Sequence, residues 1–373
     1  MRGLIRLIII LLAIVQNVFF LKIKKTVPKK ILIAHNLLLG DTLLLAPLMK
    51  RIHEKYPDAK KFILAKPGFI PLFANTPYGF KALTFDPKNF LDIWKMFSLG
   101  PYDLSYIAGD NRYSWFARAI GSKWIVGISD DKPQWKNWML DEVRSFDLKP
   151  ATWPDMMGRL VDGRDPKPYK KDEWSRPNIK KTLSFIPSKS YVVCHLGASN
   201  PLKFWPAESW KVLIDKLKYM GFDIFISVGP GEEYLIREAD PDSKCLHIAG
   251  TCSLLEMWYL IEHAKLLISV DTGIAHLAKL SNTPIVTLFG PGSPVTHGAG
   301  NFWKLNPHMN ITVSSFPCRD QKILFRRKVN WVKRCGRGIK ECRTPGACME
   351  AITPKQVLDT LLNSDLFSRL MKV

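Results

Sequence analysis

Short apolar runs alternate with amphipathic stretches along most of the chain. In the first half, runs typical of buried parallel strands occupy residues 31–35, 62–65, 102–108 and 124–128. A turn with Gly40 and Asp41 follows the first run, and residues 42–56 then carry leucine and isoleucine at the spacing of one helical face. A strand followed by a helix is the unit from which parallel sheets are built.

The alternation stops and then resumes, which predicts two domains. Proline, lysine, aspartate and tryptophan accumulate between residues 129 and 188, and we place a linker in the second half of this stretch. A second series then predicts strands at 191–195, 222–228, 265–270 and 284–289 and helices at 208–219, 254–263 and 274–280. We therefore expect two parallel sheets, in domains over residues 28–180 and 181–373, with ligands outside the carboxyl ends of the strands.

The first residues form a separate hydrophobic segment, in which apolar runs at 7–15 and 18–21 are preceded by arginines and followed by lysines. This apolar core is short for a membrane span, which needs about 20 residues, and no small-residue cleavage site follows it. A helix in the interface, a marginal span and a helix buried against the body stay open. Because the heavier positive charge follows the segment, we expect residues 1–27 to associate with a membrane from its cytoplasmic side.

The chain is strongly basic, with 54 basic and 33 acidic side chains and a net charge of +21. Such an excess favours an anionic partner, namely a phosphorylated lipid, a membrane surface, a nucleotide or a nucleic acid, although a solvated surface is the simpler alternative. Nine basic residues lie between positions 322 and 343, beside Phe325 and Trp331, a mixture that nucleic-acid-binding proteins also use. An anionic glycolipid explains this charge and the N-terminal segment together, so we predict lipid and no nucleic acid.

The cysteines indicate a reducing compartment. Seven cysteines, an odd number, do not make a disulfide framework in a chain of this length. Cys194 and Cys245 lie in strand-like stretches, where cysteine behaves as a small hydrophobe. The late cysteines lack the C-x-x-C spacing of a zinc knuckle, which favours a thiol-rich loop over a metal site at Cys318, Cys335, Cys342 and Cys348.

The most specific candidate chemistry follows the predicted strand at 265–270. There Asp271, Thr272 and Gly273 precede a predicted helix that carries His276. The first N–H groups of a helix have no intrahelical partner and its dipole favours negative charge, so this helix start is a candidate diphosphate site. A plain N-cap role for Asp271 is a compatible alternative. The rigid loop at 289–294, with two glycines and two prolines, is expected to line the same site.

Two other loops after predicted strands carry candidate ligand-binding residues. After residues 191–195 the chain holds Ser199 and Lys203 before a Trp-Pro pair that opens a helix. Small residues let a phosphate approach the backbone, and we expect Lys203 to neutralise it, with a solvated loop lysine as the alternative interpretation. Glu232 and Glu233 follow the strand at 222–228, where a carboxylate can accept both ribose hydroxyls. A glutamate pair favoured by a helix dipole explains the same residues equally well.

In this order, these motifs resemble glycosyltransferase family 9, the ADP-heptose:lipopolysaccharide heptosyltransferases, over residues 30–365. The resemblance implies an α/β fold of the GT-B type, with two Rossmann-like domains facing a central cleft, here preceded by the N-terminal hydrophobic segment. It implies inverting transfer of a heptose from ADP-L-glycero-D-manno-heptose to the inner core of lipopolysaccharide, without a metal or other cofactor. Together with the positive charge that follows the N-terminal segment, this acceptor leads us to expect a place on the cytoplasmic side of the bacterial inner membrane.

The family's residues carry over position by position. Its general base matches Asp41, its diphosphate-binding lysine matches Lys203, and its ribose-binding glutamate matches Glu233, with Glu232 as the alternative. Its Asp-Thr-Gly-x-x-His motif matches Asp271, Thr272, Gly273 and His276 without a gap. The loop at 250–252, with Thr251 and Cys252, matches the adenine wall.

The chain departs from the family in its hydrophobic N-terminus, in its long basic segment at 318–348, and in the loop at 35–39, where the family has small residues. The last difference concerns contacts with the acceptor. Two other functions stay open: the same family with another nucleotide sugar or acceptor, and a non-catalytic membrane-surface binding protein on a GT-B scaffold.

Overall fold

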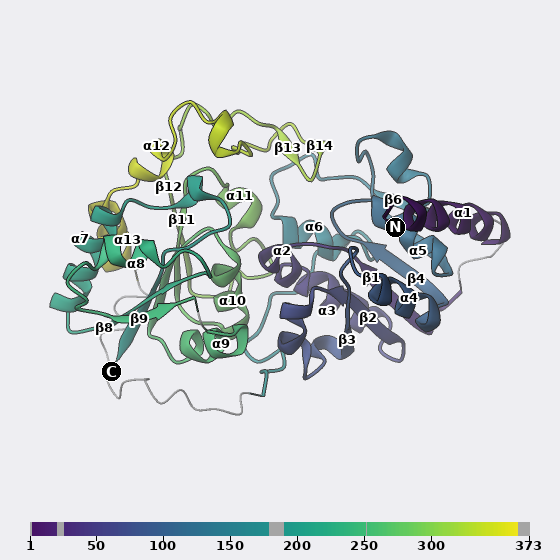
Figure 1. Cartoon of the computed structure of the whole chain (residues 1–373), viewed down its shortest axis with the longest axis horizontal. Helices are drawn as coiled ribbons and strands as arrows, with labels where there is room; N and C mark the ends of the chain where they lie inside the picture. Colours follow the sequence, from purple (N-terminus) through teal and green to yellow (C-terminus); the bar gives the residue numbers. More distant parts are fainter. Residues whose placement is uncertain (1, 21–25, 179–189, 251, 365–373) are drawn as a thin grey trace. The chain divides into compact units, whose positions relative to one another are not determined.

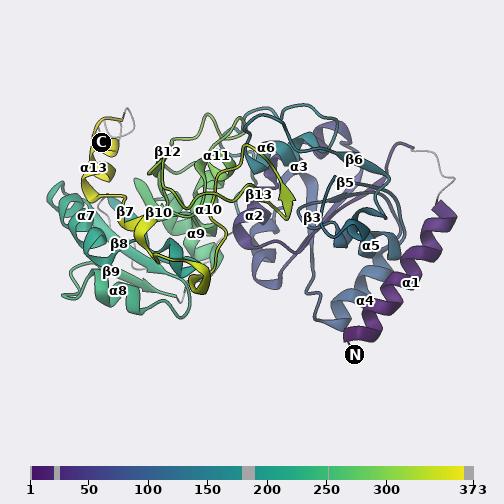
Figure 2. The same cartoon turned by 90° about the horizontal axis from the view of Figure 1, so that it is seen from above.

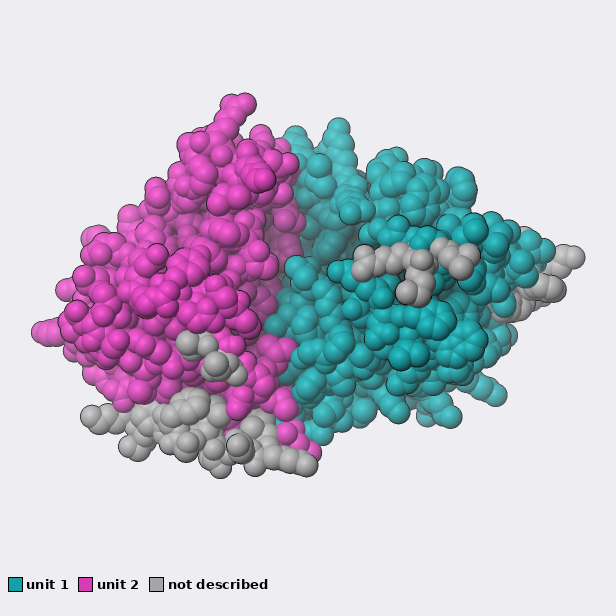
Figure 3. Space-filling model, in the orientation of Figure 1, with its two compact units in different colours: residues 1–167, 175–177, 322–332 teal, residues 168–174, 178–321, 333–373 magenta. Residues whose placement is uncertain are grey.

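The computed structural model describes residues 2–20, 26–178, 190–250 and 252–364. It divides into two compact units, coloured in Figure 3. Unit 1 comprises residues 1–167, 175–177 and 322–332, and unit 2 comprises residues 168–174, 178–321 and 333–373. Each unit is an α/β domain around one six-stranded parallel sheet, which confirms the predicted fold class (Figures 1 and 2).

The sheet of unit 1 has the strand order β3-β2-β1-β4-β5-β6, and all its pairs are parallel. Its strands are β1 (Lys30–Ala34), β2 (Lys60–Ala65), β3 (Phe80–Thr84), β4 (Tyr102–Ile107), β5 (Ser122–Ile128) and β6 (Glu142–Arg144). The direction of winding reverses between β1 and β4. The loops that leave the carboxyl ends of two such strands diverge and leave space for a ligand.

The helices of unit 1 lie on both faces of its sheet. They are α1 (Arg2–Phe20), α2 (Leu39–Leu43), α3 (Ala46–Lys55), α4 (Phe90–Leu99), α5 (Arg112–Ala119) and α6 (Trp153–Arg159), with the 3-10 turns η1 (Pro67–Phe73), η2 (Pro77–Gly79) and η3 (Gln134–Asn137). α3 packs against α6, whereas α1 packs outside α5.

The prediction of one continuous helix at 42–56 is wrong in its first part. The helix is split into α2 and α3, with Pro47 in the first turn of α3. Proline has no N–H and clashes with the preceding turn, so it is tolerated only where a helix begins. Gly40 and Asp41, which were predicted in a turn, lie in α2, and Asp41 is in its first turn.

The N-terminal helix α1 contacts unit 1 through one face only. Ile9 and Leu12 pack against a cluster formed by Ala13, Trp115, Ala119 and Met139. The earlier alternative of a helix buried against the body therefore describes half of α1, since the opposite face is exposed. Within the part of the chain that the structure describes, no helix is both long enough and apolar enough to cross a membrane.

The sheet of unit 2 repeats the plan, with the order β12-β11-β10-β7-β8-β9 and parallel pairs throughout. The four predicted strands are confirmed as β7 (Tyr191–His195), β8 (Asp223–Val228), β10 (Leu266–Val270) and β11 (Ile285–Phe289). The two edge strands, β9 (Leu246–Ala249) and β12 (His308–Thr312), were not predicted. Edge positions need less apolar sequence, and β12 has only Ile311 buried.

The helices of unit 2 cover the faces of its sheet. They are α7 (Ala207–Tyr219), α8 (Tyr234–Ala239), α9 (Leu254–Glu262), α10 (Gly273–Ser281), α11 (Pro294–His297), α12 (Ala347–Glu350) and α13 (Pro354–Leu362), with the 3-10 turns η4 (Pro201–Lys203) and η5 (Ile339–Glu341). The helices predicted at 208–219, 254–263 and 274–280 are confirmed to within one residue at each end.

Part of the basic segment returns to unit 1 as a hairpin of β13 (Ile323–Leu324) and β14 (Arg327–Lys328). Arg327 is buried and donates hydrogen bonds to the carbonyl oxygens of Gly109, Ile128 and Ser129 at 2.7–3.0 Å. The Phe325 ring packs on Trp153 with centroids 3.9 Å apart, and the Trp331 indole N–H donates to the Asp147 carbonyl. Both aromatic side chains therefore serve packing, rather than forming the exposed platforms on which bases stack.

Candidate active site

Lys203 and Asp271 meet at the switch point of the unit 2 sheet. β7 and β10 are neighbours, and the chain continues from them to opposite sides of the sheet. Lys203 lies in η4 after β7, and Asp271 directly follows β10. The Lys203 ammonium donates to the Asp271 carbonyl oxygen at 2.7 Å and to its carboxylate Oδ2 at 2.8 Å. The structure thus joins two residues that the sequence identified separately.

Asp271 is held as a carboxylate although it is buried. Burial by itself raises the pKa of an aspartate, because desolvation disfavours the charged form. The Lys203 ammonium more than offsets this effect and holds the pKa of Asp271 well below its usual range. The pair is therefore a buried carboxylate with an ammonium that keeps 26% of its side chain exposed.

Two histidines beside Asp271 are held neutral. Burial lowers the pKa of His276 well below its ordinary value and that of His297 to about 3, despite the nearby carboxylate. His276 Nε2 lies 4.0 Å from Asp271 Oδ1, and its Nδ1 has no hydrogen-bond partner among the described residues. Lys203 therefore supplies the positive charge at this end of β10 that an anion could contact.

Helix α10 begins directly after Asp271, next to the Lys203 ammonium. Thr272 is the N-cap and its side chain makes no capping hydrogen bond, so the plain N-cap role considered for Asp271 is wrong. The first N–H groups of α10, from Gly273 onward, have no intrahelical partner. Together with the helix dipole they form an anion-binding geometry next to the Lys203 ammonium.

The glycine-rich loop after β11 packs against Asp271, as predicted. A Cβ built on Gly292 would lie 2.5 Å from Asp271 Oδ2. Because that distance is far below van der Waals contact, only glycine allows the loop to approach the carboxylate this closely.

The two adjacent glutamates have different surroundings. The Glu232 carboxylate accepts hydrogen bonds from the backbone N–H groups of Gly229, at 2.8 Å, and Ala198, at 3.1 Å. Glu232 thereby ties the loop after β8 to the loop after β7. Glu233 is the N-cap residue of α8, and its Oε1 accepts a bond from the Gly231 N–H at 3.0 Å. Glu232 is thus committed to structure, and Glu233 keeps the more accessible carboxylate.

Replacing Gly197 with alanine is expected to destabilise this loop pair by about 1–3 kcal/mol, the usual cost of overpacking. A Cβ at Gly197 would lie well inside the van der Waals radius of Glu232 Oε2 and would push that carboxylate off its two N–H donors. The measurement is the thermal midpoint of unfolding. Gly68→Ala is the control, since a Cβ at Gly68 meets nothing within 4 Å. Equal midpoints for the two variants would show that Glu232 does not fasten the loops.

In unit 1, Asp41 lies at the corresponding switch point, because α2 follows β1 and β1 neighbours β4. Asp41 is half-buried in the first turn of α2, where the helix dipole favours a carboxylate. Nearby in sequence, His35 is buried, and its Nδ1 accepts a hydrogen bond from the Leu37 N–H at 3.1 Å. Burial and the Lys66 charge lower the pKa of His35 to about 3, so it is a neutral side chain.

Sequence reasoning missed two arginines at the carboxyl end of β4. Asp110, which follows β4, forms ion pairs with Arg112 at 2.7 Å and with Arg326 at 3.6 Å. The two arginine side chains are 50% and 61% exposed, so they present positive charge to solvent. No local signal identifies this pair, because Arg326 reaches unit 1 only through the hairpin of residues 322–332.

The model of "Glycosyltransferase family 9 (heptosyltransferase)" matches residues 114–323, which is more than half of the chain. The chain belongs to glycosyltransferase family 9. Its curated relatives include lipopolysaccharide heptosyltransferase 3 of Escherichia coli K12, which is 26% identical over 300 residues, or 72% of this chain and 86% of the relative. Lipopolysaccharide heptosyltransferase 2 of the same strain is 23% identical over 307 residues, or 71% of this chain and 84% of the relative.

Solved structures of this fold agree over nearly the whole chain. The E. coli ADP-heptose lipopolysaccharide heptosyltransferase II is 18% identical with a TM-score of 0.67, covering 91% of this chain and 99% of its own. The E. coli heptosyltransferase WaaC with ADP is 17% identical with a TM-score of 0.66, covering 89% of this chain and 99% of its own. This glycosyltransferase therefore has the GT-B fold of these heptosyltransferases.

The other predicted donor-binding residues of this glycosyltransferase are Ser199, Thr251 and Cys252. Ser199 is exposed in the loop after β7. Cys252 is half-buried directly before Ser253, which forms a capping box with Glu256 at the start of α9. Thr251 lies outside the described residues.

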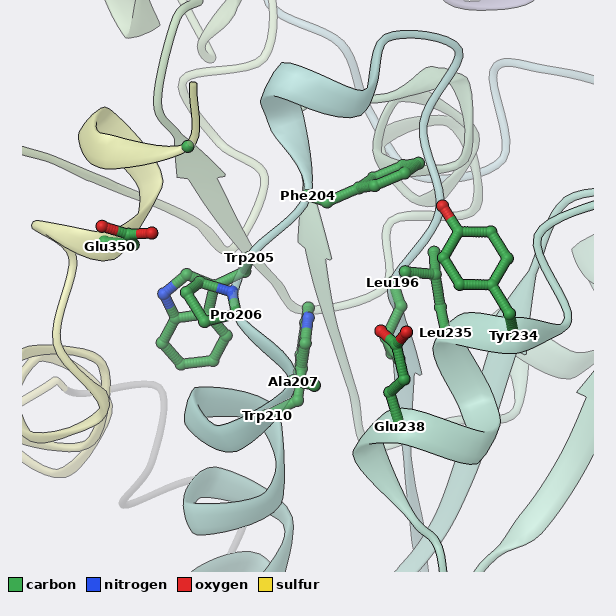
Figure 4. Close-up of a pocket in the computed structure, with 11 residues that line it drawn as sticks. Leu196, Phe204, Trp205, Pro206, Ala207, Trp210, Tyr234, Leu235, Glu238 and Glu350 are labelled. Atoms are coloured by element: carbon green, nitrogen blue, oxygen red, sulfur yellow. The ribbon is translucent and has the colours of Figure 1, made fainter. Parts of the chain in front are cut away.

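A cavity of about 260 Å³ is lined by Phe204 and Trp205, which directly follow Lys203 in the chain (Figure 4). Phe204, Trp205 and Trp210 form one wall, Tyr234 and Glu238 of α8 form another, and Lys203 and Asp271 are not among its lining residues. Trp205 and Trp210 also belong to the hydrophobic core of unit 2, and their packing supports the loop that carries Lys203. Within the described ranges, no group of three or more His, Cys, Asp and Glu side chains is arranged to hold a metal ion.

Acid is expected to destabilise unit 2 of this glycosyltransferase through His195. Burial lowers the pKa of His195 to about 4, and its Nδ1 lies 2.8 Å from the Ser227 hydroxyl. Between about pH 6.5 and 4, His195 is therefore protonated in the unfolded chain and neutral in the folded chain. The free energy of unfolding falls by about 1.4 kcal/mol for each pH unit in this range.

Urea unfolding at pH 5.0 and 7.5 measures this loss of stability. His195→Gln should reduce the difference between the free energies of unfolding at these two pH values by about 2 kcal/mol, because the slope of about 1.4 kcal/mol per pH unit applies only between pH 5.0 and 6.5. His263→Gln, on the exposed C-cap of α9, should keep the wild-type dependence. An unchanged slope in His195→Gln would mean that His195 is protonated in the folded chain.

Proposed function

We propose that this glycosyltransferase transfers a heptose from ADP-L-glycero-D-manno-heptose to the inner core of lipopolysaccharide, with inversion and without a metal ion. The observation that carries the proposal is the pairing of Lys203 with Asp271 at the start of α10, which forms a site for a diphosphate. The curated relatives support the sugar and the acceptor, since they are lipopolysaccharide heptosyltransferases, and a solved relative holds ADP.

The donor's ADP would be held by groups of unit 2. The Lys203 ammonium and the first N–H groups of α10, at Gly273 and beyond, face the diphosphate and stabilise the negative charge that develops as ADP leaves. Thr272 and His276 complete the motif on the same helix, and the exposed Ser199 contributes a hydroxyl. Lys203 supplies the positive charge that a metal ion provides in other glycosyltransferases.

The nucleoside would lie against the loops that follow β8 and β9. Glu233 accepts the ribose hydroxyls, because its carboxylate is the more accessible of the glutamate pair. Glu232 holds the surrounding loops through Gly229 and Ala198. The loop at 250–252, with Thr251 and Cys252, forms the adenine wall.

The chemical step is a single displacement. The acceptor hydroxyl oxygen forms a bond to the anomeric carbon of the heptose as the bond from that carbon to the diphosphate oxygen breaks. The Asp41 carboxylate accepts the hydroxyl proton, and ADP leaves with the bonding electron pair. Attack from the face opposite the leaving group inverts the anomeric centre.

The acceptor is a phosphorylated glycolipid, so the enzyme acts at the cytoplasmic side of the inner membrane. The exposed guanidinium groups of Arg112 and Arg326, at the same edge of the unit 1 sheet as Asp41, are suited to the acceptor's anionic groups. The net charge of +21 favours approach to an anionic membrane surface.

The test is ADP release and product mass with purified protein, ADP-heptose and a panel of core-truncated lipopolysaccharides. A mass gain of one heptose on one truncation is the expected result. Donor binding without transfer on any truncation would point to another acceptor. A chain that binds no ADP-heptose would use another nucleotide sugar, or would be a non-catalytic membrane-surface binding protein.

A further inference from the structure

The helix α1 has two apolar faces. Its inner face packs against unit 1 through Ile5, Ile9, Leu12 and Ala13, which follow helical spacing. An ordinary surface helix is polar on its other face. In α1 the other face is aliphatic and 42–64% exposed, with Leu7, Ile8, Ile10, Leu11, Ile14, Val15 and Val18.

Helix α4 lies beside α1 (Figure 2). Phe97 of α4 packs against the same cluster as Ile9 of α1. Phe90 and Trp94 lie seven and three residues before Phe97, on one stripe of the helix, and are 51% and 64% exposed. Leu91, in the first turn of α4, is 71% exposed.

Two more exposed tryptophans lie next to the cluster that α1 contacts. Trp115 of α5 belongs to the cluster that Leu12 contacts. Its ring lies 6.1 Å from that of Trp135 and 6.3 Å from that of Trp138, and these two rings are 40% and 64% exposed. We call the outer residues of α1, together with Phe90, Leu91, Trp94, Trp135 and Trp138, the apolar face. It holds 12 of the 25 exposed large apolar side chains in the described part of the chain.

The charges around the apolar face are basic. Residues 2–20 and 132–140 contain no acidic residue, and Arg6, Lys95 and Lys132 are exposed. The acidic residue of α4, Asp92, is half-buried and accepts a hydrogen bond from the Asp86 N–H at 2.9 Å. The rim of the face is therefore suited to an anionic surface.

We propose that the apolar face rests on an anionic phospholipid bilayer, with α1 in the plane of the interface and the exposed aromatic side chains beside it. The proposal rests on the proposed function, in which the acceptor is a membrane glycolipid. Tryptophan and aliphatic side chains enter the boundary between headgroups and acyl chains, and the flanking Lys and Arg contact lipid phosphates. Monomeric proteins in water rarely expose a contiguous apolar patch of this kind.

The decisive test uses the full chain and the variant Trp94→Ala/Trp138→Ala, which keeps α1 intact. Partition into vesicles of phosphatidylglycerol and phosphatidylcholine, measured by co-sedimentation, is expected to fall by about tenfold or more, because two large apolar side chains no longer enter the lipid. Phosphatidylcholine vesicles should bind the wild type more weakly than the mixed vesicles. Tyr219→Ala, which removes a 91% exposed ring from unit 2, is the matched control and should bind as the wild type does.

Unchanged partition of the double tryptophan variant would overturn the proposal, since α1 or charge alone would then explain binding. It would also be overturned if the wild type dimerised in vesicle-free solution and Leu11→Glu/Ile14→Glu made it monomeric, because the face would then be a protein interface. A transfer assay with detergent-solubilised acceptor separates this proposal from the proposed function. The tryptophan variant should retain transfer there, whereas a wild type that transfers nothing but binds vesicles would contradict only the proposed reaction.

Discussion

Replacing Asp41 with asparagine is expected to lower kcat by about 10²–10⁴-fold, the usual contribution of a general base. Asparagine keeps the size of the side chain in the first turn of α2 but cannot accept the proton of the acceptor hydroxyl. The proposed donor site lies in unit 2, so the Kd for ADP-heptose should stay at the wild-type value. Steady-state transfer and calorimetric titration of the donor measure the two quantities.

Asp58→Asn is the matched control for this experiment. Asp58 is an exposed carboxylate in the same unit, two residues before β2, and its replacement should leave both kcat and donor Kd unchanged. Near-full transfer by Asp41→Asn, with the donor bound normally, would assign the proton transfer to another group. A loss of donor binding would instead show that Asp41 acts by positioning the donor.

Replacing Lys203 with alanine should have two separable effects. Loss of the ammonium removes the group that we propose stabilises the departing diphosphate, which should lower kcat/KM by about 10²–10³-fold. It also leaves the Asp271 carboxylate buried without the cation that holds its pKa low, which costs roughly 3 kcal/mol of stability. Transfer kinetics and thermal unfolding report the two effects.

The double variant Lys203→Ala/Asp271→Asn distinguishes them. In this variant no unpaired charge is left buried, because asparagine replaces the carboxylate. The thermal midpoint should therefore recover toward the wild-type value while transfer stays low. Lys211→Ala, on the exposed side of α7, is the control and should change neither. If Lys203→Ala bound ADP as tightly as the wild type does, the diphosphate would have to lie elsewhere.

Much of the fold could be predicted because buried parallel strands are locally encoded. The apolar runs that became β7 and β10 are wholly buried in the structure, and their period and length identify them without tertiary information. The edge strand β12 was missed, since a strand that is covered less needs fewer apolar residues. The break between α2 and α3 was also missed, although Pro47 was visible, because helical periodicity continues across it.

The residues of the candidate site were visible as separate motifs, and the sequence could not show which of them touch. Lys203 and Asp271 are 68 residues apart, and only the pairing of β7 with β10 makes them an ion pair. Likewise, Glu232 and Glu233 are equivalent in sequence, and the tertiary structure separates them. It gives Glu232 two backbone donors from different loops, while Glu233 stays at the start of α8.

The sequence by itself determined the two α/β domains, the family motifs and an apolar N-terminal segment, because strand periodicity, helix starts and composition are local properties. Only the tertiary structure decided which face of α1 is covered and that Trp94 and Trp138 lie exposed beside this helix. It also returned the hairpin with Arg326 and Arg327 to unit 1. These arrangements depend on contacts between residues far apart in the chain, and such contacts leave no periodic trace in the sequence.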